Sequence, residues 1–180
     1  MKIFLSPVFL LTLLLNPIAT KALNLQHEMI DYAVCFTPGG SCTQDIIEII
    51  DSAKKQVLVQ AYQLTSIPIA LSLVQAHRRG VDVKVILDKS QERIKRSQSY
   101  TPAKFLQSHG IPTWIDYKPA IAHNKVMIID SEIVITGSFN FSKAAQVRNA
   151  ENLLILKGVN LAATYANNWR TREMVSKKIN

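Results

Sequence analysis

The sequence predicts one α/β domain with a mixed, largely parallel β-sheet that is flanked by helices on both faces. The 180 residues are enough for a single domain with one sizeable core, and 48% of them are hydrophobic. A strand, a helix and a second strand follow one another over residues 57–87, which indicates a right-handed crossover between two parallel strands. Further apolar segments add strands, and a long helical segment follows them.

The individual elements follow from the spacing of apolar residues and from the residues that end them. Ser41 and Gln44 fit a capping box at the start of a first helix, and Gly80 is suited to end a second one. The polar and basic segment 88–102 is expected to be a loop. We expect strands at 57–63, 81–87, 112–115, 125–129, 133–136 and 153–156, and helices at 42–55, 67–79, 103–109 and 161–174.

The first residues predict a signal peptide at 1–22, followed by one domain at 23–180. Lys2 precedes an apolar run over residues 3–15, and the segment 20–22 resembles a small-x-small cleavage site. An uncleaved membrane anchor is the alternative, although this run is shorter than the ~20 residues that span a bilayer as a helix. Both alternatives predict an exported protein, secreted or periplasmic.

The chain is basic, with a formal net charge of +8 at pH 7. Removal of the predicted signal peptide would take away Lys2 and Lys21 and leave +6. A basic balance favours polyanionic partners, either nucleic acid or an anionic membrane surface. A solvated basic surface without any ligand agrees with the charge equally well.

Cys35 and Cys42 are the two cysteines of the chain, and Pro38-Gly39-Gly40 lies between them. This spacer can turn the chain so that the two cysteines meet, and an exported protein favours a disulfide between them. Two unpaired thiols are the alternative. A zinc site is not expected, because the sequence nearby offers no further cysteine or histidine ligands.

The segment that begins at His123 has the pattern H-x-K-x4-D, which ends at Asp130. Side chains alternate along a strand, so His123 and Lys125 are expected on the same face, ready for one anionic group. Asp130 is expected in a turn away from that group, with a structural role. Alone, an H-x-K pattern is common and carries little weight.

Two further polar segments flank predicted strands. In Gly137-Ser138-Phe139-Asn140, the hydroxyl of Ser138 and the amide of Asn140 share a face and can bind phosphate oxygens beside a lysine. Glu151 precedes an apolar strand and can accept a hydrogen bond from an imidazole, which fixes the tautomer of the ring. Each residue also has an ordinary explanation as a turn residue or ion-pair partner, and only the combination indicates chemistry.

The combination resembles the signature of the phospholipase D superfamily, which is H-x-K-x4-D followed by G-S-x-N. Both parts are intact here, and Glu151 stands where short members of the superfamily carry a glutamate. The resemblance covers residues 34–169 and is greatest to short, exported bacterial members with a single motif, which include endonucleases and proteins named phospholipase D. It implies a phospholipase D-like α-β-α sandwich.

The resemblance also implies a covalent mechanism, in which one histidine attacks phosphorus and a second protonates the leaving oxygen. The expected catalytic residues are His123, Lys125, Asn140 and Glu151, and the expected phosphate-binding residues are Lys125, Ser138 and Asn140. His123 would be the nucleophile, and Glu151 would orient a His123 ring of its own chain or of a partner. The chain has one H-x-K, and His27, His77 and His109 are expected to be structural or on the surface. A homodimer in which two His123 rings face one phosphate would supply the second histidine.

No cofactor and no metal is expected, because the cationic and amide donors suffice for a phosphate and no ligand set suits magnesium or zinc. The expected activity is hydrolysis of phospholipid head groups by a phospholipase D-type phosphodiesterase. A metal-independent, non-specific endonuclease acting on DNA or RNA is the alternative, favoured by the charge and by the basic segment 89–96. A non-catalytic module that binds phosphate polyanions is disfavoured by the intact site residues.

Overall fold

The structure is a computed structural model, and it describes residues 27–92 and 101–179. The expected signal peptide at 1–22 and residues 93–96 of the basic segment 89–96 lie outside the described residues, and what was predicted for them stays a prediction. Among the described helices, none combines the length and the apolar character needed to cross a membrane.

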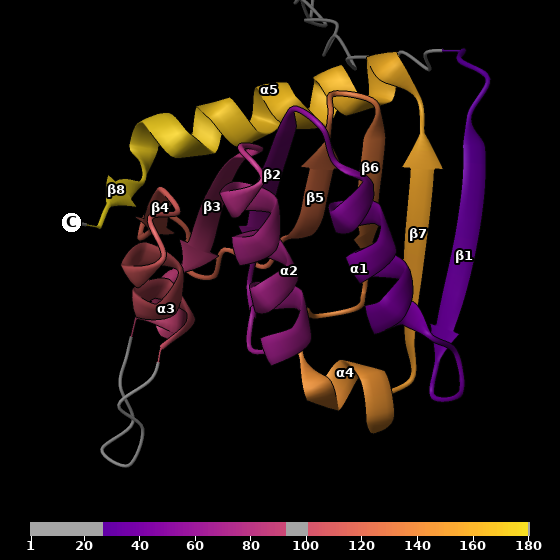
Figure 1. The fold of residues 1–180 in the computed structure, drawn as a ribbon, viewed down its shortest axis with the longest axis horizontal. Coiled ribbons are helices and arrows are strands. Elements are labelled where there is room, and N and C mark those ends of the chain that lie inside the picture. Colours follow the sequence, from indigo (N-terminus) through magenta and orange to yellow (C-terminus); the bar gives the residue numbers. More distant parts are fainter. Residues whose placement is uncertain (1–26, 93–100, 180) are drawn as a thin grey trace, which may run out of the picture.

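An eight-stranded mixed sheet forms the centre of the domain, in the order β1-β7-β6-β5-β2-β3-β4-β8 (Figure 1). The strands are β1 (Asp31–Thr37), β2 (Gln56–Ala61), β3 (Asp82–Asp88), β4 (Thr113–Asp116), β5 (Lys125–Ile129), β6 (Ile133–Gly137), β7 (Glu151–Lys157) and β8 (Lys177–Lys178). The helices are α1 (Cys42–Ser52), α2 (Ile67–Arg78), α3 (Pro102–Ser108), α4 (Lys143–Val147) and α5 (Val159–Val175), with a 3-10 turn at Lys89–Gln91. The predicted α/β class with one mixed sheet is confirmed.

The expectation that this sheet is largely parallel is wrong. β2 pairs with β3 and β3 with β4 in parallel, whereas the other five pairings within the described residues are antiparallel. The β-α-β unit that led to the expectation extends over three strands only. β5 and β6 are joined by the short turn 130–132, and a connection of this length can join only antiparallel neighbours.

Helices cover both faces of the sheet, as predicted. Neighbouring residues of a strand belong to different cores, as Leu58 and Val59 do, because side chains alternate across a sheet. On the α5 face, the Trp169 indole Nε1 donates a hydrogen bond to the backbone oxygen of Val59 at 2.9 Å. The core on the face covered by α1, α2 and α3 includes the helix residues Ile46, Ile50, Ile69, Leu73, Ala103 and Leu106. The core on the α5 face includes the helix residues Ala162, Ala166 and Trp169.

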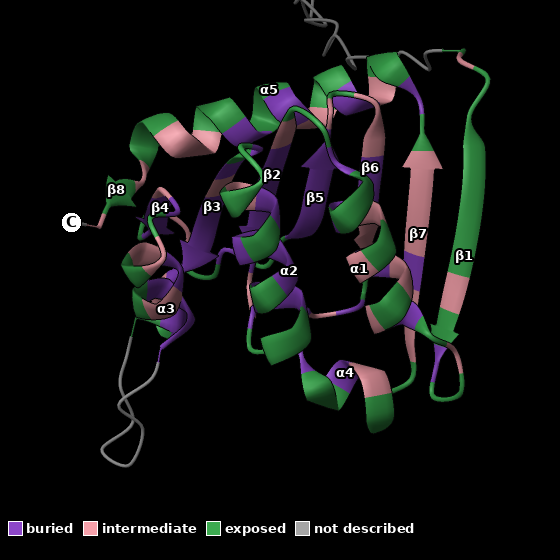
Figure 2. Cartoon of the chain, in the orientation of Figure 1, coloured by how far each residue is buried: buried purple, intermediate pink, exposed green. Residues whose placement is uncertain are grey.

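No sequence pattern described above predicts β1, α4 or β8. β1 is an edge strand, and most of it is exposed (Figure 2), with Tyr32 and Phe36 facing solvent. The expected capping box at the start of α1 is also wrong. Ser41 makes no capping bond with its side chain, whose Oγ instead donates to Asp45 Oδ1 at 3.1 Å. Gln44 donates from Nε2 to Glu48 at 3.1 Å rather than closing the box.

The strands bring the predicted site residues to one edge of the sheet. β2, β3, β4 and β6 end at this edge, whereas β5 and β7 begin there. It is the lower edge in Figure 1, beside α4. We call it the site edge, and it carries Tyr62, His123, Ser138 and Glu151.

Candidate active site

His123 and Lys125 meet at the site edge. Lys125 is the first residue of β5 and is 7% exposed, and His123 lies just before the strand. The Lys125 ammonium Nζ is 3.0 Å from Nδ1 and 3.1 Å from Nε2 of the His123 ring, and it donates to the His123 backbone oxygen at 3.0 Å. A cation therefore stands against the ring of the predicted nucleophile, where it can stabilise an anion that both side chains touch.

Burial changes the acidity of Lys125. Because it removes the ammonium from water, burial lowers the pKa of Lys125 below its usual value, while the nearby charge of Glu151 acts in the opposite direction. A partly desolvated cation interacts more strongly with a phosphate than an exposed one does. The burial that disfavours the charged lysine thus suits it to an anionic substrate.

Tyr62 completes one side of the site, and no prediction from the sequence gave it a role. Its ring centroid lies 4.7 Å from that of His123 with an interplanar angle of 48°, and Lys125 Nζ lies 5.3 Å from the same centroid. The Tyr62 backbone N–H donates to the oxygen of Asn124 at 2.7 Å, which ties it to the segment before β5. The available signal is its place near the end of the predicted strand 57–63.

Ser138 and Glu151 hydrogen-bond to each other. Ser138 Oγ donates to Glu151 Oε2 at 2.6 Å and accepts from the Asn152 backbone N–H at 3.0 Å. The second carboxylate oxygen of Glu151 accepts from Asn149 Nδ2 at 2.9 Å. In the described residues Glu151 forms no hydrogen bond with His123 of its own chain. Ser138 is engaged with Glu151, and its predicted contact with a phosphate stays a prediction.

Gly137 lets two backbone segments come together next to Ser138. Its φ is +143°, and a Cβ at this position would lie 2.3 Å from the backbone oxygen of Asn152. That oxygen accepts from the N–H of Ser138 at 3.1 Å. A glycine is therefore required for the approach of β7 to this turn, rather than for the approach of a ligand.

Asn140 is half-buried and has an unused polar group. Its Oδ1 atom is buried and has no hydrogen-bond partner in the part of the chain that the structure describes. The two ends of an amide exchange places on rotation about the last side-chain bond, so the same position can present the Nδ2 donor. Such a donor can bind a phosphate oxygen.

Asp88, at the end of β3, holds the segment that leads to His123. Its Oδ2 accepts from the Ala122 backbone N–H at 2.8 Å, its Oδ1 accepts from the Ser90 N–H at 2.8 Å, and the residue is 3% exposed. Burial would raise the pKa of Asp88, but these hydrogen bonds hold it below its usual value. Sequence analysis missed this residue, although it directly follows the predicted strand 81–87.

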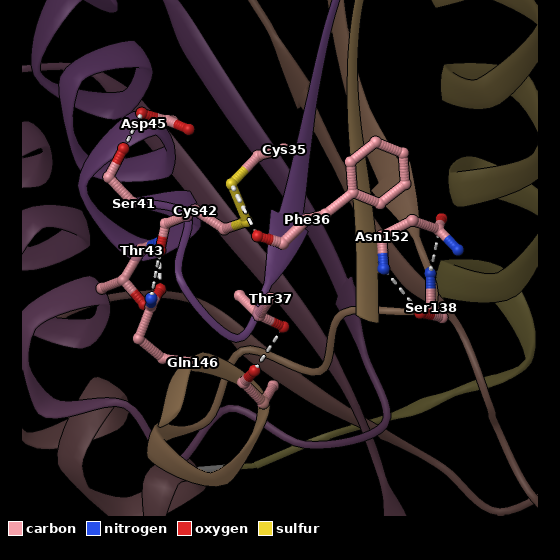
Figure 3. The surroundings of a disulfide bond; sticks show 12 residues. Cys35, Phe36, Thr37, Ser41, Cys42, Thr43, Asp45, Ser138, Gln146 and Asn152 are labelled. Carbon is pink, nitrogen blue, oxygen red and sulfur yellow. Dashed lines mark hydrogen bonds between the residues drawn. A yellow bond between two sulfur atoms is a disulfide. The ribbon is translucent and has the colours of Figure 1, made fainter. Parts of the chain in front are cut away.

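Cys35 and Cys42 are bonded to each other, and the bridge joins β1 to the start of α1 (Figure 3). Near this bridge, Thr37 Oγ1 donates to the backbone oxygens of Ala145 at 2.8 Å and Asn149 at 3.1 Å. Because Asn149 is itself bonded to Glu151, the β1 end and its loop are connected to the site.

Asp130 lies at the opposite edge of the sheet, far from His123. Its carboxylate accepts backbone N–H groups of Lys54 at 2.8 Å, Lys55 at 2.7 Å and Gln56 at 2.8 Å. Burial would raise the pKa of Asp130, but these hydrogen bonds hold it below its usual value. The structure thus places this residue at the entry to β2, with no contact to the site.

The remaining histidines are distant from the site edge. His77 lies in α2 and His109 directly after α3, where its ring packs against Phe105, while His27 precedes β1. No second imidazole thus stands beside His123 in the described residues. The same residues contain no group of three or more histidine, cysteine or acidic side chains that could hold a metal ion.

Known proteins resemble this chain along most of its length. The family described as "Cardiolipin synthase, PLD-like domain" matches residues 46–172. A phospholipase D of Rickettsia prowazekii (strain Madrid E) is 38% identical over 175 residues, which cover 91% of this chain and 83% of that protein. The structure of Nuc, a phospholipase D family member from Salmonella typhimurium, has a TM-score of 0.78 and 33% identity, covering 84% of this chain and 99% of that one. NucT from Helicobacter pylori, at 21% identity and a TM-score of 0.72, shares the fold over 84% of this chain and all of its own, 100%.

The family match spans well over half of the chain, and the Rickettsia relative is similar over most of its own length. The resemblance drawn from the two motifs is therefore confirmed for the family, the fold and the class of enzyme. The chain belongs to the phospholipase D superfamily and is a phosphodiester hydrolase of the phospholipase D type.

Proposed function

We propose that the chain hydrolyses the head-group ester of phospholipids through a phosphohistidine formed on His123 in a homodimer. The contact of the Lys125 ammonium with the His123 ring carries this proposal, because it puts a nucleophile and a cation at one point of the site edge. The name of the Rickettsia prowazekii relative, phospholipase D, supports a lipid substrate.

The proposed reaction has two steps. A ring nitrogen of His123 attacks phosphorus, a P–N bond forms, and the bond from phosphorus to the head-group oxygen breaks as the partner's His123 gives that oxygen a proton. The partner's His123 then takes a proton from water, whose oxygen attacks phosphorus while the P–N bond breaks. Phosphatidic acid and the head-group alcohol leave, and both rings return to their first state. Lys125 and Asn140 bind the phosphate oxygens throughout.

A dimer around the site edge would supply the second imidazole that the described residues of one chain do not place there. Apolar surface beside the edge supports such a contact, since Ile121 is 55% exposed only two residues before His123, and Tyr117 is 43% exposed. We also propose that the protein is exported. The Cys35–Cys42 disulfide supports export, because such bonds persist in oxidising compartments.

Mixing of variants tests the mechanism and the dimer together. His123→Ala is expected to lose at least about a thousandfold in turnover of phospholipid vesicles, because the nucleophile is gone, whereas a matched His109→Ala variant keeps its activity. Rapid acid-free quenching with radiolabelled lipid should leave label on the wild-type protein and none on His123→Ala. Added to the wild type and allowed to exchange subunits, His123→Ala should reduce activity by forming mixed dimers with one ring. Unchanged wild-type activity in that mixture would overturn the composite site.

Endonuclease activity is the second candidate, favoured by the charge of +8 and by the exposed basic residues Lys118, Lys143 and Arg148 near the site edge. Plasmid DNA is therefore assayed beside the vesicles, with a metal chelator in excess in both reactions. Cleavage of DNA without release of head groups would replace the lipid proposal and leave the His123 chemistry in place. Activity that returns only with added divalent metal would contradict the metal-free mechanism.

A further inference from the structure

We propose that a surface formed by α2 and α4 docks on anionic phospholipid bilayers and holds the site edge against them. The two helices lie next to each other at this edge (Figure 1). We call the surface the docking surface, and it consists of Ile67, Leu71, Lys143, Val147 and Arg148. This inference rests on the proposed lipid hydrolysis and names the partner that would present the substrate to the site.

Aliphatic side chains of the docking surface face solvent. Ile67, Leu71 and Val147 are 61%, 45% and 55% exposed. Ile67 and Leu71 are four residues apart on α2 and therefore lie on the same side of the helix. Between α2 and α4, Ile67 and Gln146 border a hollow of about 380 Å³ whose lining is mostly apolar. Exposed aliphatic groups gathered in this way mark a contact with another protein or with a membrane.

Two cations stand beside these aliphatic groups. Lys143 begins α4 and lies on the same side of it as Val147, four residues later, and Arg148 directly follows the helix. Both cations are exposed, and neither side chain forms a hydrogen bond or an ion pair within residues 27–92 and 101–179. Among the described residues, none that lines the hollow is acidic. The charge of the docking surface therefore complements an anionic bilayer, which attracts each lysine or arginine near it.

The combination of groups favours a bilayer over a nucleic acid. Phosphates of either partner attract cations, but a nucleic acid strand also offers bases, which stack on aromatic side chains. None of the residues of the docking surface is aromatic. On a bilayer, aliphatic groups enter the boundary of the acyl region, while the cations remain with the lipid phosphates.

Backbone hydrogen bonds join the docking surface to the site. The N–H groups of Thr65 and Ser66 both donate to the oxygen of Phe141 at 2.9 Å, and the Phe141 N–H donates to the oxygen of Gln63 at 3.1 Å. The segment that leads from the site into α2 is therefore paired with the segment that leads into α4. The start of α2 is five residues from Tyr62, and five residues of extended chain span at most about 18 Å. A bilayer that touches the docking surface thus lies close to the site edge.

The docking surface is held in shape by Gln146. Its Oε1 accepts from the Thr43 backbone N–H at 2.8 Å, and its Nε2 donates to the oxygen of Gly40 at 2.7 Å (Figure 3). This side chain ties α4 to the start of α1 and to the loop closed by the disulfide. Docking therefore requires no ordering of α4, which would weaken binding.

Vesicle binding tests the docking surface separately from catalysis. The purified chain is sedimented with vesicles of phosphatidylcholine, with and without phosphatidylglycerol, in a His123→Ala background that leaves the lipid intact. Lys143→Gln/Arg148→Gln should bind the anionic vesicles about thirtyfold more weakly, because two cations are removed from the contact. Lys54→Gln/Arg78→Gln removes the same charge from exposed positions at the opposite edge of the sheet and should change the affinity less than about threefold.

The aliphatic groups are tested with a second pair of substitutions. Ile67→Ser/Val147→Ser should weaken binding to both kinds of vesicle at least about tenfold, because this contact does not depend on lipid charge. The matched control is Val159→Ser/Met174→Ser, at residues of α5 that are 60% and 78% exposed, and it should bind as the wild type does. With His123 restored, Ile67→Ser/Val147→Ser should lose vesicle hydrolysis mainly through KM and keep the wild-type turnover of the soluble diester bis(p-nitrophenyl) phosphate.

Four outcomes would contradict the docking surface. Affinities of both pairs equal to those of their controls would overturn it while lipid hydrolysis stands. If the aliphatic pair turned a dimer into a monomer in sedimentation and lost turnover of the soluble diester, a second copy would cover this surface instead. Weaker plasmid binding by the cation pair, with unchanged vesicle binding, would assign the surface to nucleic acid. A wild type that hydrolyses the soluble diester but no phospholipid, in vesicles or as short-chain monomers, would overturn the lipid proposal and the docking surface with it. Equal urea midpoints of all variants establish that folding does not cause the differences.

Discussion

The two ends of β5 belong to one sequence motif, yet their side chains are in opposite situations. At the far end, the Asp130 carboxylate accepts three backbone N–H groups and touches nothing in the site. At the site edge, Lys125 is buried beside His123, and the Oδ1 atom of Asn140 lacks a partner in the described residues. At the far end the carboxylate is fully engaged with backbone N–H groups, whereas at the site edge a buried polar atom is left without a protein partner.

We expect this difference to separate a structural residue, Asp130, from a residue that acts on a ligand, Lys125, inside a single motif. A carboxylate whose bonds are all made to backbone stabilises the native state, because those N–H groups would otherwise lose their partner. Burial disfavours the charged form of Lys125 and lowers its pKa, and we expect this lysine to act on a ligand rather than to stabilise the fold. Removal of the charged group should therefore lower stability at Asp130 and turnover at Lys125.

Of the substitutions at the two ends of β5, Lys125→Met is expected to have the larger effect on activity. The change removes the cation beside His123 and keeps the length of the side chain, so turnover of any phosphodiester substrate should fall about a hundredfold to a thousandfold. The free energy of unfolding should stay the same or rise, since a desolvated charge is replaced by an apolar group. Steady-state kinetics and urea unfolding measure the two quantities. A variant that loses stability while each folded molecule keeps its turnover would contradict the comparison.

Asp130→Ala is expected to show the reverse. Loss of the carboxylate leaves the N–H groups before β2 without their acceptor, and the free energy of unfolding should fall by about 2–3 kcal/mol. Turnover per folded molecule should change less than about twofold, because no contact joins Asp130 to the site.

The pH dependence of stability sharpens this prediction. Because the folded pKa of Asp130 is below its ordinary value of about 3.9, its contribution is present above that pH and is lost as the pH falls through the folded pKa. Asp130→Asn should therefore unfold with a flatter pH dependence than the wild type in acid. If the stability curves of the two proteins ran parallel below about pH 4, ionisation of the Asp130 carboxylate would contribute nothing to stability.

The sequence allowed the buried elements to be predicted closely but not the contacts between distant ones. The strand 125–129 agrees with β5 residue for residue, because continuous Val and Ile pack on both faces of a central strand. β1 was not predicted, because it is a mostly exposed edge strand and its sequence lacks the apolar pattern of a buried strand. The parallel unit was extended too far, because strand order is set by pairings that local spacing does not contain.

The same reasoning applies to the candidate site. His123, Lys125, Ser138 and Glu151 were found because they stand in short, ordered motifs, and the structure brings them to one edge. Tyr62 and Asp88 were not found as site residues, because each reaches the segment before β5 from a strand that is distant in sequence. Only the order of strands in the sheet places them there.

Asp88→Asn is expected to lower kcat less than Lys125→Met does, and it tests whether the site depends on such distant support. An asparagine retains one acceptor oxygen but turns an amide NH₂ towards one of the two backbone N–H groups that Asp88 binds, at Ser90 or Ala122. We expect the segment before His123 to lose its position, with kcat reduced about tenfold and KM changed less than about twofold.

Asp116→Asn is the matched control for Asp88→Asn. Asp116 is also a buried carboxylate at the end of the neighbouring strand, 2% exposed, and it binds Arg172 through hydrogen bonds of 2.8, 2.8 and 2.6 Å. It forms no bond to the segment 119–123. Its substitution should lower stability at least as much as that of Asp88, because a buried ion pair is broken, and should leave kcat nearly unchanged. If both variants lower kcat in proportion to their loss of stability, Asp88 supports the fold in general, and the position of His123 does not depend on it in particular.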